Sequence, residues 1–340
     1  MRPQYNVLLC AALLLATTAA QGSDKGAELR DRLKAAASLS SLDDPTLKPW
    51  HWQLDVTLFD NDGKNPSTGM LEMWSSGDKM LMHYSLRSEQ GTVLRIADKL
   101  YRTPGETKQL PLAVFLELQL IHPIPDEVFA PTVAERLLKQ NAGKVKVDSI
   151  APTLVAQTNE TVSRDQPFSF VLEPGSPRLL MTSENGWLRI VRRSLGMFQA
   201  HEVPTDLVVY TNTTTSEEAK TVKLEGMAPD AQAFEASPDM TPFSEPIQVS
   251  SGVTATMVLS QDPPSYPIEA KARHAQGTVV FDAIIGRDGH VESLQQVGTA
   301  DPALTKEADR TIRTWIYRPF LVNGIPVEVK TQIHMNFTFG

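Results

Sequence analysis

Residues 327–339 read VEVKTQIHMNFTF, a stretch in which hydrophobic and polar side chains alternate. One set of positions is apolar: Val327, Val329, Ile333, Met335, Phe337 and Phe339. The other set is polar: Glu328, Lys330, Gln332, His334 and Asn336. The alternation predicts one long strand with a single buried face, entered through a turn at Asn323-Gly324. A terminal strand tends to lie on a sheet edge, where its free N–H and C=O groups are open to a partner.

The residues before this strand predict two more strands and a helix. Residues 277–285 alternate in the same way, and a Gly-Arg-Asp-Gly turn leads into a second strand at 290–297. Asp301 and Pro302 are typical of the first turn of a helix. The apolar stripe of that helix consists of Leu304, Ala308, Ile312 and Trp315. The stripe is expected to pack on the sheet.

Four short motifs follow one another in this region. They are Pro264-Ser265-Tyr266-Pro267, Gly277-Thr278-Val279-Val280-Phe281, Asp288-Gly289-His290-Val291 and Trp315-Ile316-Tyr317-Arg318-Pro319. With the final strand, they make residues 265–340 resemble the C-terminal domain of TonB-family energy transducers. The resemblance implies a small β-α-β domain that binds a short segment of outer-membrane receptors, the TonB box, by adding it to the sheet as a strand.

The same resemblance implies where a partner would bind. Residues 327–339 would be the pairing strand, and Tyr266-Pro267 matches the family's Tyr-Pro at the entry to the domain. The expected partner-binding residues are Tyr266, Pro267, Val327, Val329, Gln332, Ile333, His334, Asn336 and Phe337. Pairing of two copies through this domain, giving a homodimer, is a second expected partnership.

Residues 1–20 have the order of a secretory signal peptide. Arg2 supplies the positive charge, and an apolar run and small residues follow it up to Ala20. The apolar run is shorter than the roughly 20 residues needed to cross a bilayer, so we expect export and cleavage near Ala20. Retention as an inner-membrane anchor is the alternative. The sequence therefore predicts a periplasmic protein, whereas force-transmitting family members carry an N-terminal membrane helix and a long Pro-rich spacer.

Residues 21–235 predict an antiparallel β-rich domain. Period-two alternation starts at residues 50–58, and short strands follow to about residue 96. Residues 110–121 are apolar nearly all round, which predicts a buried helix. This order resembles the LolA-like half-barrel that carries lipoproteins in the periplasm. The resemblance implies a pocket for acyl chains, with the candidate residues Trp50, Trp52, Leu54, Met80, Met82, Tyr84 and Leu116. The alternative is that these residues are ordinary core.

The expected fold class is α+β, with a half-barrel at 21–235, a Pro-containing linker at 236–264 and a small β-α-β domain at 265–340. The net charge of -8 and the absence of a basic cluster argue against nucleic acid as a partner. The 7 histidines lack metal-ligand spacing, the single cysteine is Cys10, and no nucleotide or hydrolase motif occurs. We therefore expect no catalysis, no cofactor and no metal.

The functional prediction is a periplasmic TonB-like protein associated with TonB-dependent transport. It would bind segments of outer-membrane receptors or other proteins by strand addition. The alternative is a lipid or lipoprotein carrier with an accessory TonB-like domain.

Overall fold

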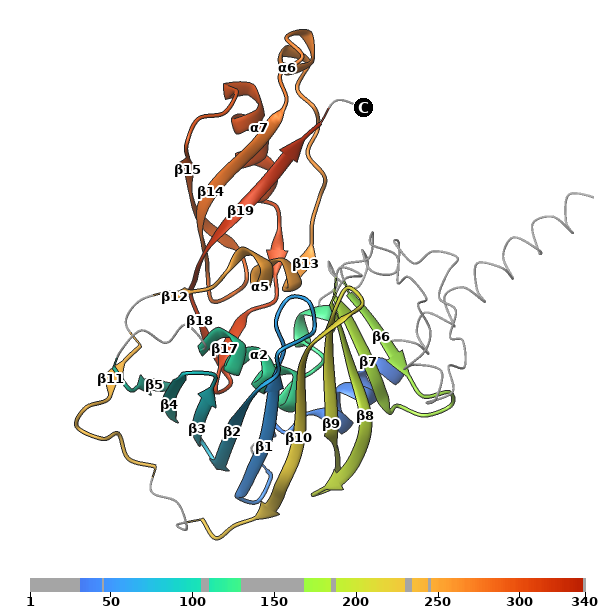
Figure 1. The fold of residues 1–340 in the computed structure, drawn as a ribbon, viewed down its shortest axis with the longest axis vertical. Helices are drawn as coiled ribbons and strands as arrows, with labels where there is room; N and C mark the ends of the chain where they lie inside the picture. The colour runs from blue at the N-terminus through green and yellow to red at the C-terminus, as the bar shows by residue number, and fades with distance from the viewer. Residues whose placement is uncertain are drawn as a thin grey trace, which may run out of the picture.

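The structure is a computed structural model that describes residues 31–44, 46–104, 110–129, 168–184, 188–229, 234–243 and 246–338. The expected signal peptide at residues 1–20 lies outside these ranges. Figure 1 shows two lobes: a large curved sheet, called here the half-barrel lobe (31–243), and a smaller C-terminal lobe (246–338) above it. The expected α+β class is confirmed.

Eleven strands of the described chain form the antiparallel sheet of the half-barrel lobe. They are β1 (Trp50–Leu58), β2 (Ser67–Ser76), β3 (Lys79–Leu86), β4 (Glu89–Ile96), β5 (Lys99–Arg102), β6 (Phe168–Leu172), β7 (Leu179–Glu184), β8 (Leu188–Phe198), β9 (His201–Thr211), β10 (Thr214–Gly226) and β11 (Thr241–Pro242). Their order is β11-β5-β4-β3-β2-β1-β10-β9-β8-β7-β6. Within the two meanders β1–β5 and β6–β10 each strand pairs with its neighbours in sequence, and the meanders join where β1 pairs with β10.

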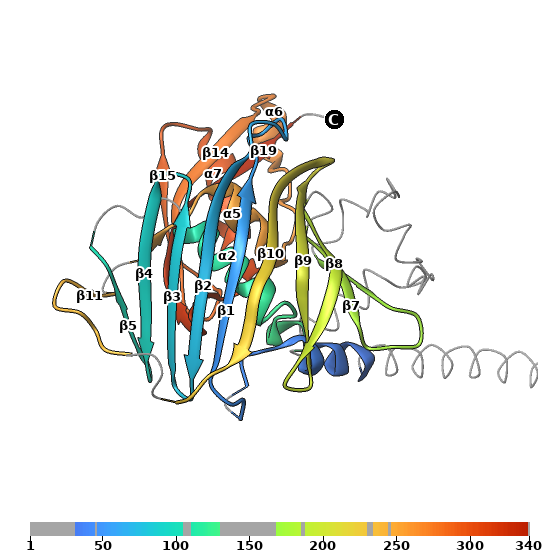
Figure 2. The ribbon, with the colours of Figure 1, turned by 60° about the horizontal axis from the view of Figure 1, so that its bottom comes forward.

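The helix α2 (Leu110–Ile121) lies against the concave face of this sheet, and η1 (Asp126–Phe129) follows it (Figures 1 and 2). Residues 31–40 form a further helix at one end of the sheet. The predicted burial of α2 is confirmed, because apolar side chains on nearly all its sides enter the core.

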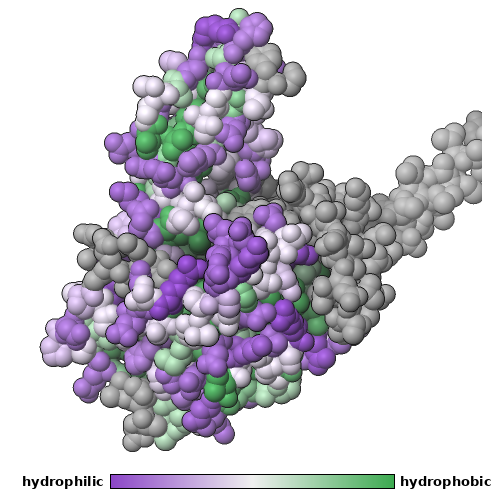
Figure 3. All heavy atoms as spheres, viewed as in Figure 1, coloured by the Kyte–Doolittle hydropathy of each residue, from purple (hydrophilic) through white to green (hydrophobic). Residues whose placement is uncertain are grey.

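Hydrophilic residues cover most of the molecular surface that Figure 3 shows, and hydrophobic residues gather there only in small patches.

The C-terminal lobe contains a four-stranded sheet with the order β12-β19-β14-β15. Its strands are β12 (Ile247–Gln248), β14 (Gly277–Ile285), β15 (Val291–Val297) and β19 (Val329–Phe337). The helix α7 (Pro302–Ile312) packs over β14 and β15, with Asp301 as its N-cap, as predicted. The shorter elements are α5 (Ser251–Thr256), β13 (Val258–Ser260), α6 (Ile268–Ala272), β16 (Ile316–Tyr317), β17 (Phe320–Val322) and β18 (Ile325–Val327).

The strand expected at 327–339 is divided. Val327 ends β18, where it pairs with Phe320 in the β17–β18 hairpin around the predicted Asn323-Gly324 turn. β19 begins at Val329 and pairs with β14. The alternation of side chains continues through Glu328, but the pairing partner changes there, which the alternation does not reveal. Residue 339 lies outside the described residues.

The interval expected to be a linker, 236–264, is built into both lobes. β11 pairs with β5, β12 pairs in parallel with β19, and β13 pairs with β16. Its prolines keep these elements short, because proline lacks an N–H for a ladder, but they do not prevent pairing. One hydrophobic cluster runs through both lobes, from Trp52 and Leu116 to Phe281 and Ile333.

Candidate partner-binding edge

The outer edge of β19 is covered by the protein's own chain at one end only. The Ile247 N–H donates to the carbonyl oxygen of Glu328, and the Val249 N–H donates to that of Lys330, both at 2.9 Å. The chain then enters α5, whose N-cap is Ser250 and whose Thr254 hydroxyl is hydrogen-bonded to that of Thr331 of β19 at 3.0 Å. β12 therefore occupies the start of this edge and leaves the rest.

Alternation fixes which main-chain groups lie on the uncovered part. In a strand, the N–H and C=O of one residue point to the same side, and those of the next residue point to the opposite side. Since Glu328 and Lys330 accept from the β12 side, the even-numbered residues Gln332, His334 and Asn336 direct their groups to the same side. Within residues 246–338, no strand and no main-chain hydrogen bond reaches these three residues there.

The side chains of β19 divide between solvent and core. Gln332, His334 and Asn336 are exposed, and Gln332 Nε2 donates to Asp282 Oδ1 at 3.0 Å on the same face. The odd-numbered residues are buried, among them the expected contact residues Val329, Ile333 and Phe337. Their main-chain groups point towards β14 and their side chains lie in the core, so these three residues offer a partner no hydrogen bond at this edge.

Tyr266 contacts the far end of β19, and Pro267 follows it at the start of α6. The ring of Tyr266 packs edge-on against Phe337, with centroids 5.9 Å apart, and its hydroxyl donates to the carbonyl oxygen of Ala275. Pro267 is the N-cap residue of α6, and Ile268 beside it is 81% exposed. Tyr266 therefore has a packing role at the end of β19. The exposed apolar side chain of Ile268 lies two residues further along the chain.

The seven expected lipid-pocket residues are buried together in the half-barrel lobe: Trp50, Trp52, Leu54, Met80, Met82, Tyr84 and Leu116. None is more than 4% exposed, and α2 lies where the concave face would hold an acyl chain. Trp52 Nε1 donates to Thr221 Oγ1 at 3.0 Å, so even its polar atom is used internally. Their arrangement is that of a packed core.

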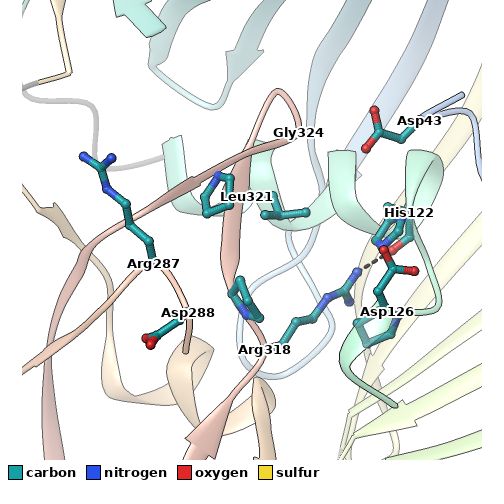
Figure 4. Close-up of a pocket in the computed structure, with 11 residues that line it drawn as sticks. Asp43, His122, Asp126, Arg287, Asp288, Arg318, Leu321 and Gly324 are labelled. Atoms are coloured by element: carbon teal, nitrogen blue, oxygen red, sulfur yellow. Dashed lines mark hydrogen bonds between the residues drawn. The ribbon is translucent and has the colours of Figure 1, made fainter. Parts of the chain in front are cut away.

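A cleft of about 440 Å³ lies between the lobes and was not predicted. In Figure 4, Arg287 and Asp288 line its left side, and His122 and Asp126 line its right side. Arg318 lies between them and donates to the carbonyl oxygen of His122.

The electrostatics of the cleft centre on His122. Its pKa is lowered by burial and by the charge of Arg318, against an opposing effect of Asp126 and Asp43. The cleft is lined by both acidic and basic side chains, so its charge favours neither an anionic nor a cationic ligand. In the sequence, Arg318 stood out only as part of the Tyr-Arg-Pro motif. No sequence pattern indicated that His122 would line a cleft.

Two further features concern metal ions and membranes. Among the described residues, no three or more histidine, cysteine, aspartate or glutamate side chains are grouped to hold a metal ion. In the same part of the chain, every helix is too short or too polar to cross a membrane.

Known proteins resemble parts of this chain. Protein TonB of Vibrio cholerae is 27% identical over 110 residues, which cover 30% of this chain and 45% of the Vibrio protein. The chain therefore matches less than half the length of this relative. The solution structure of the Pseudomonas aeruginosa TonB C-terminal domain is 26% identical and covers 24% of this chain and 84% of that domain, with a TM-score of 0.22.

A LolA superfamily protein from Nitrosomonas europaea is 5% identical and covers 58% of this chain and 93% of that protein, with a TM-score of 0.32.

For the C-terminal lobe, the family model described as Gram-negative bacterial TonB protein C-terminal matches residues 262–339. The resemblance seen in the motifs is confirmed, and residues 262–339 carry a TonB C-terminal domain.

Proposed function

We propose that this protein is a non-catalytic, TonB-like component of transport in the bacterial envelope. Its C-terminal lobe would capture an extended segment of an outer-membrane receptor in the periplasm by adding it to the edge of β19. The observation that carries this proposal is the row of outward main-chain groups at Gln332, His334 and Asn336, which remains open after β12 ends.

The open edge limits the length of the segment. Gln332 to Asn336 spans about 13 Å at ~3.3 Å per residue, so a partner strand of about five residues would satisfy the open groups. The segment would continue the line of β12, which already shows that this edge accepts a neighbouring strand. A longer segment would meet β12 at Lys330 and would have to displace it.

The exposed face of β19 offers specificity beside this backbone pairing. In strand addition, main-chain bonds give affinity and alternate side chains give specificity. Gln332, His334 and Asn336 present two amides and an imidazole, and Lys330 and Asp282 flank them. The preferred segment would therefore place polar side chains on this face.

The test uses two substitutions of one residue in the full-length protein. His334→Pro removes the outward N–H without touching the bonds to β14, since proline is tolerated on an edge where its nitrogen faces away from the ladder. His334→Ala removes the side chain but keeps the N–H. The probe is a set of synthetic ten-residue peptides from the periplasmic ends of TonB-dependent receptors, with binding measured by fluorescence anisotropy.

We expect a peptide of this set to bind the wild type, His334→Ala to bind within about threefold of it, and His334→Pro to bind at least about tenfold more weakly. Equal binding of the alanine and proline variants would contradict strand addition at this edge. The burial of all seven candidate pocket residues in one hydrophobic cluster disfavours the lipid-carrier alternative.

A further inference from the structure

The tip of the β17–β18 hairpin is buried inside the half-barrel lobe. Asn323 is 0% exposed, and its Nδ2 donates to the carbonyl oxygens of Met80 at 3.2 Å and Val93 at 3.1 Å, which lie on neighbouring strands β3 and β4. Both turn residues have positive φ, 47° at Asn323 and 77° at Gly324, as a type I′ turn requires. A Cβ at Gly324 would lie 2.6 Å from Arg95 Nη1, so glycine permits this close approach.

Glu117 of α2 lies directly beneath the tip. Its side chain is buried, and its Oε2 accepts a hydrogen bond from the main-chain N–H of Asn323 at 3.2 Å. The charged groups that act on this carboxyl are Arg95 of β4 and Asp43, and Arg95 Nη1 also lies 4.0 Å from Asp43 Oδ1. The hairpin therefore closes a carboxyl group off from water beside a cation that is shared with a second carboxylate.

Burial favours the neutral form of such a group. It raises the pKa of Glu117 from 4.5 to about 8, although the Asn323 N–H and Arg95 act in the opposite direction. Asp43 adds to the increase. Near neutral pH the docked hairpin therefore contacts a protonated carboxyl group, whereas a water-exposed Glu117 would be ionised.

We propose that the β17–β18 hairpin is a proton-dependent latch, which holds the C-terminal lobe in the half-barrel while Glu117 is protonated and is released as Glu117 ionises. Only Glu328 separates β18 from β19, so the latch also controls how the candidate edge is held. This inference goes beyond the proposed function, because strand addition does not require the lobes to separate.

The direction of the pH effect follows from proton linkage. The docked state has the higher pKa, so docking takes up a proton at pH values between the two pKa values. The contribution of protonated Glu117 to docking is complete below about pH 4.5 and is lost as the pH rises through about 8. Between these values the docking constant should fall by about tenfold per pH unit.

The experiment follows the separation of the lobes in the full-length chain. Fluorophores are placed on cysteines at Met197 of the half-barrel lobe (65% exposed) and Ile268 of the C-terminal lobe (81% exposed), in a Cys10→Ser background. Energy transfer between them is measured against urea at pH 6 and pH 9, and far-UV circular dichroism of the same samples reports unfolding. Glu117→Gln mimics the protonated carboxyl, and Glu235→Gln is the exposed control.

In the wild type and in Glu235→Gln, energy transfer should be lost at lower urea at pH 9 than at pH 6, before the dichroism signal falls. Glu117→Gln should show the same midpoint at both pH values. Asn323→Ala, which removes the amide bonds to β3 and β4, should lower the midpoint at pH 6. The proposal is overturned if Glu117→Gln keeps the pH dependence of the wild type, if Asn323→Ala leaves the midpoint unchanged, or if lobe separation always coincides with unfolding.

Discussion

At the residue scale, Glu307 shows how one side chain fixes the entry to the C-terminal domain. Its carboxylate accepts from Arg310 Nη2 at 2.6 Å, from the main-chain N–H of Ser265 at 2.8 Å and from Thr311 Oγ1 at 3.3 Å. Ser265 precedes Tyr266, so this carboxylate ties the start of the domain to α7. These bonds, Arg310 first, lower the pKa of Glu307 to about 2.

This lowered pKa predicts the sign of an acid effect. A carboxylate with a lowered folded pKa contributes stability above its unfolded pKa of about 4.5, and this contribution is lost as the pH falls through about 2. Glu307→Gln should therefore be less stable than the wild type by a constant amount above about pH 5, and the difference should shrink below it. Urea unfolding at a series of pH values checks this expectation. A difference that stays constant down to pH 2.5 would contradict it.

At the element scale, α2 occupies the concave side of the half-barrel lobe. Its apolar residues share one hydrophobic cluster with those of β1, β2 and β3, and the helix contacts β17, which explains why it is apolar nearly all round. Leu116 is fully buried, whereas Leu112 is only partly buried. If α2 lines a lipid pocket, shortening one of its side chains should change the free energy of unfolding less than if α2 is packed core.

If α2 is packed core, Leu116→Ala should lower the free energy of unfolding by about 3 kcal/mol, because it leaves a cavity among side chains that cannot collapse into it. Leu112→Ala, as the matched control, should cost less than about half of that value. Urea unfolding followed by circular dichroism gives both numbers. A loss below about 1 kcal/mol for Leu116→Ala, together with acyl lipid retained by the purified wild type, would favour the carrier interpretation.

The elements that the sequence predicted are those with a local signal. The alternation in β1, the Asp301 cap of α7 and the Asn323-Gly324 turn each rest on residues close in sequence, and each is confirmed. β12 was not predicted because two paired residues carry no period, and its partner is about 80 residues away. The burial of Asn323 was also missed, because a polar turn residue is normally exposed.

At the scale of the whole molecule, the segment expected to be a linker pairs with both sheets. The segment 236–264 contributes β11 to the large sheet and β12 to the small one, and the hairpin of the C-terminal lobe completes the core around α2. Motifs located the TonB-like domain from the sequence alone. The sequence could not reveal how much of its edge stays open, because that depends on pairing with a distant segment of the chain.

The most direct test of the central claim is residue-resolved amide hydrogen exchange of the full-length protein with and without a saturating receptor peptide. Strand addition at β19 should slow exchange by at least about tenfold at the outward amides of Gln332, His334 and Asn336. The inward amides of Ile333 and Met335, which face β14, should already be protected without peptide. Bound peptide with unchanged exchange at the three outward amides would contradict strand addition at β19.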